Sequence, residues 1–438
     1  MTATISAGDT AWVLISTALV MLMVPGLALF YGGLVRQKNA LNTFMMSLSA
    51  LGIVSVQWVL GGYSLAFGPG TPWLGSLAWW GLAGVGAVPN AAYASTIPHL
   101  AFAAFQAMFA AITVALISGA VVERVRFSAY LLFVLAWTTL VYDPLAHWVW
   151  GDNGWLHSLG ALDFAGGTVV HVSAGTAALV AAIMLGQRRA IGRGALVPHN
   201  VPFTLLGAGL LWFGWFGFNA GSALGASAVA VNAFMTTHAA AAAALTTWLL
   251  IDLWRNGRTT AVGAATGAVV GLVAITPAAG FVTPRAALAI GALAAASSYA
   301  AMHLRARTRI DDALDVFACH GVAGIIGAML TGVFATTTVN AAGANGLLAG
   351  NPAQLGVQAI AVLATMALSG GLTAGIIVAL RAVMSIRATL HDELAGLDAS
   401  DHGEEAYHAG DLGELAGGAP LSGVILIQDA EELAASAA

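Results

Sequence analysis

Two histidines stand in apolar sequence and share a five-residue pattern. His171 begins HVSAG and His320 begins HGVAG, so both fit H-x-x-A-G. Each follows an acid, since Asp163 precedes His171 by eight residues and Asp315 precedes His320 by five. Imidazole changes its charge near neutral pH and can both donate and accept a hydrogen bond. The pattern therefore predicts a site that holds or relays a proton.

Haem ligation is the rival chemistry for two such histidines. Membrane haem proteins often place two histidines on one helix to hold stacked haems, and no apolar run here has that pair. A hydrogen-bonded histidine in a helical core is the plainest interpretation of either residue alone. We expect no metal and no cofactor, and we do not expect an enzyme.

The composition indicates that most of the chain lies in lipid. Of the 438 residues, 59% are hydrophobic and only 8% are charged, whereas soluble domains carry about 25% charged residues. A fold of this size with so few charges could not cover its surface in water. The net charge of −5 and the absence of a basic cluster give no indication of nucleic-acid binding.

Apolar runs long enough to cross a bilayer recur along the sequence, and a crossing helix needs about 20 such residues. We expect an all-α membrane protein with eleven transmembrane helices. The expected spans are 12–35, 41–66, 100–121, 128–149, 163–185, 201–223, 231–253, 261–280, 286–304, 313–335 and 355–384.

The positions of lysine and arginine predict the orientation. With the N-terminus outside, the inner loops, the end of the last span and the C-terminal tail hold fourteen of the fifteen Lys and Arg residues. Only Arg285 falls outside. Positive residues concentrate on the cytoplasmic side of membrane proteins. The distribution predicts an N-out, C-in protein, with a transmembrane domain at 1–390 and a cytoplasmic tail at 391–438.

The placement of the two histidine motifs predicts an inverted repeat. His171 lies in the fifth span and His320 in the tenth, and these two spans run in opposite directions. Five-plus-five repeats, at approximately 9–185 and 201–335 with a final helix at 355–384, would place the substrate path at their interface near the midplane. At 1.5 Å per residue, both rings lie about 8–12 Å into their helices and could meet there.

The acids that precede the histidines have a simple structural interpretation as well. Asp163 could cap the N-terminus of its helix or stabilise an incoming cation, and both interpretations stay open. For Asp315 we favour helix capping. Aromatic residues near the ends of the spans are most often part of an interfacial belt.

Long segments of the sequence resemble the ammonium transporter (Amt/Rh-type) family, from about Asp9 to Tyr407. They are GDTAWVLISTALVMLMVPGLALFYGGLVRQKN near the N-terminus, DFAGGTVVHVSAG (163–175), GWFGFNAGSAL (214–224) and DVFACHG (315–321). The resemblance implies a homotrimer in the plasma membrane, the inner membrane of a bacterium, with one pore in each subunit.

The resemblance also implies roles for individual residues. His171 and His320 would line a narrow apolar conduit, with Trp215 beside them. An outer site would hold ammonium, and Phe218 would stack on Phe109 as a gate. The residues implied for the outer site are Phe109, Trp150 and Ser222, with Trp148 as the alternative to Trp150, and Asp163 nearby.

Ammonium chemistry suits such a site. An aromatic ring attracts a cation by about 0.5–2 kcal/mol, and ammonium can lose its proton before entering an apolar conduit, which potassium cannot do. Ammonia would then cross past the histidines, with or without separate proton transfer. The alternatives on the same scaffold are an ammonium sensor and a gas channel.

The C-terminal tail adds one further expectation. GLDASDHGEEAYH (396–408) resembles the family's cytoplasmic motif, which packs under the pore and contacts neighbouring subunits. In bacterial relatives this face binds a PII-type signal protein, so such a partner is a hypothesis for this chain. Residues 409–438 match nothing in the family pattern.

Overall fold

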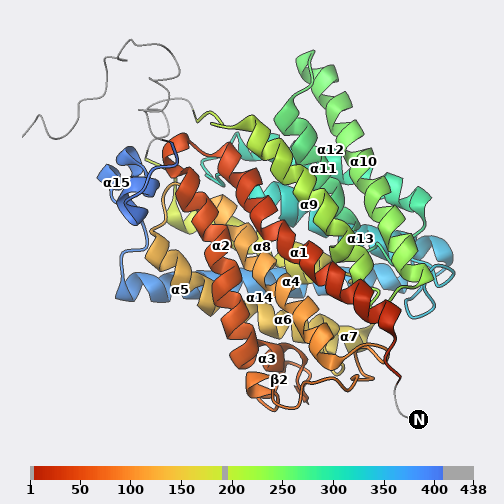
Figure 1. The fold of residues 1–438 in the computed structure, drawn as a ribbon. Coiled ribbons are helices and arrows are strands. Elements are labelled where there is room, and N and C mark those ends of the chain that lie inside the picture. Colours follow the sequence, from red (N-terminus) through yellow and green to blue (C-terminus); the bar gives the residue numbers. More distant parts are fainter. Residues whose placement is uncertain (1–3, 190–195, 408–438) are drawn as a thin grey trace, which may run out of the picture.

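The structure is a computed structural model that describes residues 4–189 and 196–407. The helices pack side by side, and the described residues form a single two-stranded hairpin of β1 (Gly70–Thr71) and β2 (Leu74–Gly75) (Figure 1). The α-helices are α1 (Ala7–Leu34), α2 (Ala40–Gln57), α3 (Tyr63–Phe67), α4 (His99–Val121), α5 (Phe127–Trp137), α6 (Asp143–Trp150), α7 (Trp155–Leu159), α8 (Ser173–Leu185), α9 (Val201–Gly221), α10 (Ala228–Asn256), α11 (Ala261–Ile275), α12 (Pro284–Arg305), α13 (Ala323–Phe334), α14 (Ala353–Val383) and α15 (Leu390–Ala395).

The two ends of the bundle are easily told apart. Helix α15 lies at one end, which we call the tail end, while α3 and β2 lie at the opposite end, which we call the hairpin end (Figure 1). The first described residues belong to the hairpin end, because the Ser6 amide donates to the Thr96 carbonyl in the long loop before α4.

Ten of the eleven expected membrane spans agree with the structure. Among the described residues, ten helical segments are long and apolar enough to cross a bilayer, and α11 is a shorter apolar helix of 15 residues. The expected span at 261–280 ends early, at Ile275, because Pro277 cannot donate a backbone hydrogen bond and disfavours helical geometry in the residue before it. The all-α multi-pass membrane protein predicted from composition is confirmed.

Four of the segments contain a π-helical turn, in which one extra residue bulges out of the helix. These turns are η2 (Trp58–Gly62) between α2 and α3, η4 (Thr138–Tyr142) between α5 and α6, η5 (Gly167–Val172) before α8, and η6 (Phe317–Val322) before α13. Such bulges occur often at functional sites, because they re-aim side chains and break the regular hydrogen-bond ladder. Both histidines of the H-x-x-A-G pattern lie in these turns.

Small residues allow the helices to approach closely. Helix α9 packs along α1, and a Cβ added at Gly207 would overlap the backbone of Phe30. In lipid the hydrophobic effect does not drive helices together, so close van der Waals contact between small residues takes its place. Glycines at such positions therefore allow close helix packing.

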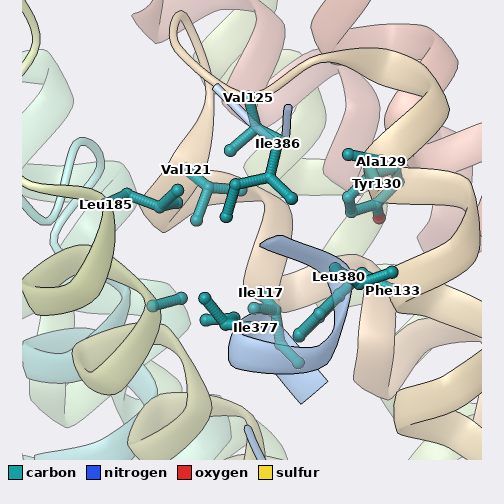
Figure 2. Close-up of a pocket in the computed structure, with 11 residues that line it drawn as sticks. Ile117, Val121, Val125, Ala129, Tyr130, Phe133, Leu185, Ile377, Leu380 and Ile386 are labelled. Atoms are coloured by element: carbon teal, nitrogen blue, oxygen red, sulfur yellow. The ribbon is translucent and has the colours of Figure 1, made fainter. Parts of the chain in front are cut away.

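One apolar pocket at the tail end is separate from the histidines. It lies among α4, α5, α8 and α14, and Ile386 and Val125 reach into it from the segments that follow α14 and α4 (Figure 2). Its volume is about 30 Å³, and its walls carry apolar side chains and the ring of Tyr130. A cavity with so few polar partners stays dry, and none of the predicted site residues line it.

Candidate functional site

The two histidines meet in the centre of the bundle. His171 in η5 and His320 in η6 are 1% and 3% exposed, and their Nδ1 atoms lie 3.3 Å apart. One nitrogen of this contact must donate and the other must accept. The tautomer of one neutral ring therefore determines the tautomer of the other. The Nε2 atom of His171 is buried and has no hydrogen-bond partner. It can therefore bind a small polar molecule that enters the bundle.

Two glycines make the meeting of the histidines possible. Helices α8 and η6 cross so closely that a Cβ on Gly175 would overlap the backbone of Gly321. These are the fifth residue of the first H-x-x-A-G pattern and the second residue of the other. The final glycine of the first pattern therefore allows the helices to cross, and Gly321 occupies a variable position of the second pattern.

A narrow cavity runs beside the histidines. Its volume is about 10 Å³, which is about the space that one water molecule needs. Apart from the two imidazoles and the indole of Trp215, its walls are aliphatic or phenyl. They are formed by Met23, Leu27, Phe30, Ile112, Leu116, Val170, Leu211, Phe218 and Val269. A larger cavity of about 180 Å³ towards the tail end shares Phe30 and His320 with it.

Aromatic rings close the cavity towards the hairpin end. Phe109 and Phe218 stack with their ring centroids 4.2 Å apart, and Trp150 meets Phe109 edge-on at 6.1 Å. Ser222 donates its hydroxyl to the Phe218 carbonyl at 2.8 Å, which leaves its oxygen free to accept. Both phenyl rings are buried, whereas Trp150 and Ser222 are half-buried. Phe109, Phe218 and Trp150 therefore form one aromatic group next to His171, and Ser222 lies one helical turn from Phe218.

The structure separates the two tryptophans that the sequence left as alternatives. Trp150 donates from its indole nitrogen to the Asp163 carbonyl at 2.9 Å and contacts Phe109. Trp148 instead donates to the Trp73 carbonyl and packs against Trp155. Of the two, Trp150 is the one that lies beside Phe109.

Asp163 organises the start of the His171 segment. Its carboxylate accepts from the backbone amides of Gly166, Gly167, Thr168 and Val169 at 2.5–3.2 Å, and from the Thr168 hydroxyl. The first amides of a helix have no partners within the helix. A carboxylate accepts their hydrogen bonds and interacts favourably with the positive end of the helix dipole. Of the two interpretations open at the sequence level, the helix cap matches this geometry.

The expected cap at the second histidine helix was wrong in detail. Asp312, not Asp315, accepts from the Phe317 amide at the start of η6, at 2.7 Å. Asp315 instead forms an ion pair with Arg305 at 2.5 Å, and its φ of 56° takes it out of helical geometry. The sequence favoured Asp315 alone, and the turn geometry shows that Asp312 is the cap instead.

Trp215 lies against the histidines, as expected, and depends on a residue that the sequence did not indicate. Its ring stacks on His171 with centroids 5.4 Å apart, and its nitrogen donates to the Thr276 hydroxyl at 3.0 Å. Thr276 is 61 residues away, just after α11. The only local signal was a threonine next to Pro277 inside an apolar run.

Haem or metal ligation does not fit this geometry. The two Nδ1 atoms are at hydrogen-bond distance, so no iron can lie between them. Within 4–189 and 196–407, no group of three or more His, Cys, Asp or Glu side chains could hold a metal ion.

The tail end carries a network of buried ion pairs. Glu123 pairs with Arg36 at 3.0 Å and with Arg188 at 2.9 Å, and Arg188 also pairs with Asp311 at 2.8 Å. Burial raises the pKa of Glu123, but the neighbouring Arg36 and Arg188 outweigh it and hold that pKa below its usual value. For Asp311 burial also acts first, and Arg188 again lowers the pKa below the usual value. Both groups are therefore ionised at neutral pH.

The described part of the tail packs on the same end. Glu393 in α15 pairs with Arg387 at 2.8 Å, and Asp398 accepts from the amides of Leu41 and Asn42 at the start of α2. The segment 396–407 thus packs against the N-terminal end of α2. The sequence predictions for 409–438 lie outside the described residues.

The chain matches known proteins over nearly its whole length. A family model described as the Ammonium Transporter Family matches residues 11–407. An ammonium transporter of Bacillus subtilis is 51% identical over 401 residues, which cover 91% of this chain and 98% of that one. Ammonium transporter Amt1 of Archaeoglobus fulgidus is 45% identical over 404 residues, covering 92% and 100%.

Solved structures agree in fold. The crystal structure of Mep2 from Saccharomyces cerevisiae superposes with a TM-score of 0.83 at 38% identity and covers 88% of this chain and 91% of that one. A structure described as a sensor Amt protein reaches a TM-score of 0.83 at 31% identity, covering 90% and 98%. The chain belongs to the ammonium transporter family, and its function is ammonium transport rather than catalysis.

Proposed function

We propose that ammonium binds at the hairpin end beside Phe109, Trp150 and Ser222, loses its proton there, and crosses as ammonia past His171 and His320. The observation that carries this proposal is the hydrogen-bonded imidazole pair in an otherwise apolar cavity about one molecule wide. A charged ion is strongly disfavoured in such a space, whereas neutral ammonia can hydrogen-bond to the rings.

The half-buried residues Trp150 and Ser222 bind the ammonium ion. The indole face and the phenyl edge attract the cation, and the free lone pairs of Ser222 accept one of its N–H bonds. Phe218 closes the path below this site and acts as the gate, because its ring must move before anything reaches His171. Trp215 fixes the plane of the His171 ring by stacking on it.

Selectivity over potassium follows from the same arrangement. Potassium is close to ammonium in size and would also be attracted by the aromatic rings. It has no proton to lose, however, so it would have to enter the cavity as an ion without the oxygen ligands that replace its hydration shell. The cavity walls offer only two imidazoles and an indole as polar groups.

The first experiment records the current that an ammonium pulse evokes in proteoliposomes, with potassium pulses as the control. An ammonium-only current means selective transport with net charge movement. If neither ion evokes a current but the vesicle interior becomes alkaline faster than in empty liposomes, ammonia is conducted passively. If ammonium evokes neither a current nor faster alkalinisation, the transport proposal is contradicted.

The histidine pair is tested by His171→Ala. Removal of one imidazole leaves the other without its partner, and a lost hydrogen bond of about 1 kcal/mol already changes a rate several-fold. We expect conduction to fall about 5-fold or more, or potassium to gain entry. Unaltered transport of ammonium over potassium would refute the role of the pair.

The distribution of lysine and arginine supports an N-out, C-in orientation in the plasma membrane, which is the inner membrane if the source is bacterial. The hairpin end would then face outwards and the tail end the cytoplasm. The shared H-x-x-A-G pattern and the π-turn at each histidine support an inverted repeat of 9–185 and 201–335, followed by 355–384, in a transporter domain at 1–390.

Assembly and regulation are further parts of the proposal. The family resemblance supports a homotrimer with one pore in each subunit, and lipid-facing helices around it. The packing of 396–407 against α2 supports a role of this face in binding a PII-type signal protein. A pull-down from lysate with and without residues 391–438 tests this partner, and equal recovery from both forms would remove it.

A second candidate function is ammonium sensing on the same scaffold. It is supported by the likeness to the structure described as a sensor Amt protein. A sensor without transport would bind ammonium and stay silent in both liposome assays. A gas channel is the remaining alternative from the sequence, and uptake of carbon dioxide by the same liposomes distinguishes it.

A further inference from the structure

The early end of α11 lies directly behind the His171 segment. Thr276 and Pro277 follow the last residue of that helix and are both buried. The Pro277 carbonyl accepts from the Phe164 amide at 3.1 Å. A Cβ added at Gly167, the first residue of η5, would overlap the Pro277 ring. These two residues, which we call the brace, therefore pack against the start of the turn that holds His171.

The first residue of the brace holds Trp215. The Trp215 indole nitrogen donates to the Thr276 hydroxyl oxygen at 3.0 Å, and the hydroxyl in turn donates to the Leu272 carbonyl at 2.8 Å. Because a threonine hydroxyl has one hydrogen, the bond to Leu272 leaves the oxygen as an acceptor for the indole. The backbone of α11 thus orients the hydroxyl, and the hydroxyl orients the indole.

Trp215 passes this constraint to the histidines. Its ring stacks on that of His171 with 20° between the two planes and 5.4 Å between the centroids. The Nδ1 atom of His171 lies 3.3 Å from that of His320. A change in the plane of the indole therefore reaches the first imidazole by stacking and the second by the hydrogen bond.

The bond to Thr276 also occupies the indole hydrogen. An indole has one donor and no acceptor, and Trp215 lines the narrow cavity beside the histidines. With its donor engaged, the indole offers that cavity only its apolar surface, so the imidazoles remain the polar groups that a molecule in the cavity meets. Without the hydroxyl, the buried N–H would have no partner, and this cost favours a different orientation of the ring.

We propose that Thr276 is a positioning residue of the transport path, which fixes the orientation of His171 through Trp215, while Pro277 supports the turn from which His171 projects. The proposal rests on the transport function proposed above. Thr276 does not line the narrow cavity itself. Its effect on conduction must therefore act through the indole.

The competing explanation is that the bond only holds two helices together, as interhelical hydrogen bonds do in membranes. The structure contains the same bond at a second place, where Trp137 of α5 donates to the Thr373 hydroxyl of α14, also at 3.0 Å. Both partners of this second bond are buried, and neither lines the histidine cavity. Thr373→Val is therefore the matched control for Thr276→Val.

The experiment measures ammonium concentration series in proteoliposomes, by current or, where no current is evoked, by internal alkalinisation. Valine has nearly the shape of threonine but cannot accept the indole hydrogen. We expect Thr276→Val to lower the maximal rate about 5-fold or more. The half-saturating concentration should stay unchanged, because Trp150 and Ser222 at the hairpin end are not touched. Thr276→Ser keeps the hydroxyl and should restore most of the rate, and Thr373→Val should conduct like the wild type.

A double-mutant comparison tests whether the effect passes through the indole. Trp215→Phe keeps an aromatic ring but has no donor for Thr276. Substitutions that act through one shared contact are not additive. We expect Thr276→Val to cause no further loss of rate in the Trp215→Phe background. The same factor of loss in both backgrounds would overturn the proposal.

The other outcomes decide as well. If the wild type conducts and Thr276→Val reaches the same maximal rate, the proposal is overturned while the transport function stands. Equal losses in Thr276→Val and Thr373→Val also overturn it, because the bond then serves only to hold helices together. A wild type that is silent in both assays contradicts the proposed function itself. If Thr276→Val does not assemble, Thr276→Ala removes the same hydroxyl without adding a methyl group and takes its place in both comparisons.

Discussion

The two mouths of the histidine path differ in the charged groups around their acids. At the hairpin end, Asp163 is satisfied by backbone amides and Thr168, and no arginine or lysine pairs with it among the described residues. At the tail end, Asp312 caps η6 through the Phe317 amide, but Asp315 pairs with Arg305 and Asp311 pairs with Arg188. The helices are alike, since each histidine lies in a π-turn, but the charges around their starts are not.

The difference implies that the two mouths interact differently with a cation. A carboxylate whose partners are uncharged leaves a net negative field at the hairpin end, which attracts a cation. At the tail end, Arg305 and Arg188 neutralise Asp315 and Asp311, which weakens the attraction for a cation there. The arrangement suits a molecule that arrives charged and leaves neutral. The predictions below test whether each mouth depends on its acid in the way this comparison requires.

The largest effect is expected for Asp163→Ala. The substitution leaves five donors at the start of the His171 segment without their acceptor, and each unsatisfied buried donor costs about 1–3 kcal/mol. We expect a loss of about 5 kcal/mol or more in stability and no measurable transport. Thermal denaturation in detergent and the liposome current measure the two effects.

Asp315→Ala is the matched variant at the other mouth. Its partner Arg305 has a side chain that is 30% exposed, so water can replace the lost contact. A stability loss as large as that of Asp163→Ala would contradict the asymmetry of the two mouths.

A smaller effect is expected for the cation site itself. Trp150→Leu removes one aromatic ring worth about 0.5–2 kcal/mol, which corresponds to about a 2- to 30-fold weaker apparent affinity for ammonium. Concentration series of the ammonium current measure it. Trp148→Leu is the control, because Trp148 packs on Trp73 and Trp155 instead. If both variants lose affinity equally, Trp150 has no special role.

The comparison also shows what could be predicted from the sequence. The histidine pair follows from the shared H-x-x-A-G pattern, and ten of the spans follow from apolar runs, whereas the aromatic group was implied by the family resemblance. The structure brings Phe109, Phe218 and Trp150 together, with Ser222 bonded to the Phe218 carbonyl. The apolar runs could be recognised because lipid requires each helix to satisfy its own backbone, which makes the signal local.

Features that depend on long-range contacts could not be predicted. The π-turns have no local signature, since one extra residue in a helix changes no apolar pattern. The exchange of roles between Asp312 and Asp315 depends on the reach of Arg305. The Gln57–Asp143 contact joins residues 86 positions apart, and nothing in either segment indicates the other.

A further prediction concerns Arg305→Gln. It removes a partly exposed ion pair, and such pairs contribute about 0.2–1 kcal/mol. We expect a fall in melting temperature of at most a few degrees and unchanged ammonium affinity, because the binding site lies at the other mouth. Altered ammonium affinity in this variant would mean that the two mouths are coupled.

The smallest effect at physiological pH is expected from the ion pairs of Glu123 and Asp311. Their pKa values in the folded protein lie below the ordinary values of 4.5 and 3.8, so the unfolded chain binds protons more readily. This contribution to stability is fully present above those values and is lost as the pH falls through the folded-state pKa. The melting temperature should therefore be flat from pH 8 to about 5 and decline only below that. Glu123→Gln should weaken the acid decline, because one of the two titrating groups is gone. A decline that begins already near pH 6.5, the ordinary pKa of histidine, would instead place the stability-limiting titration outside this network.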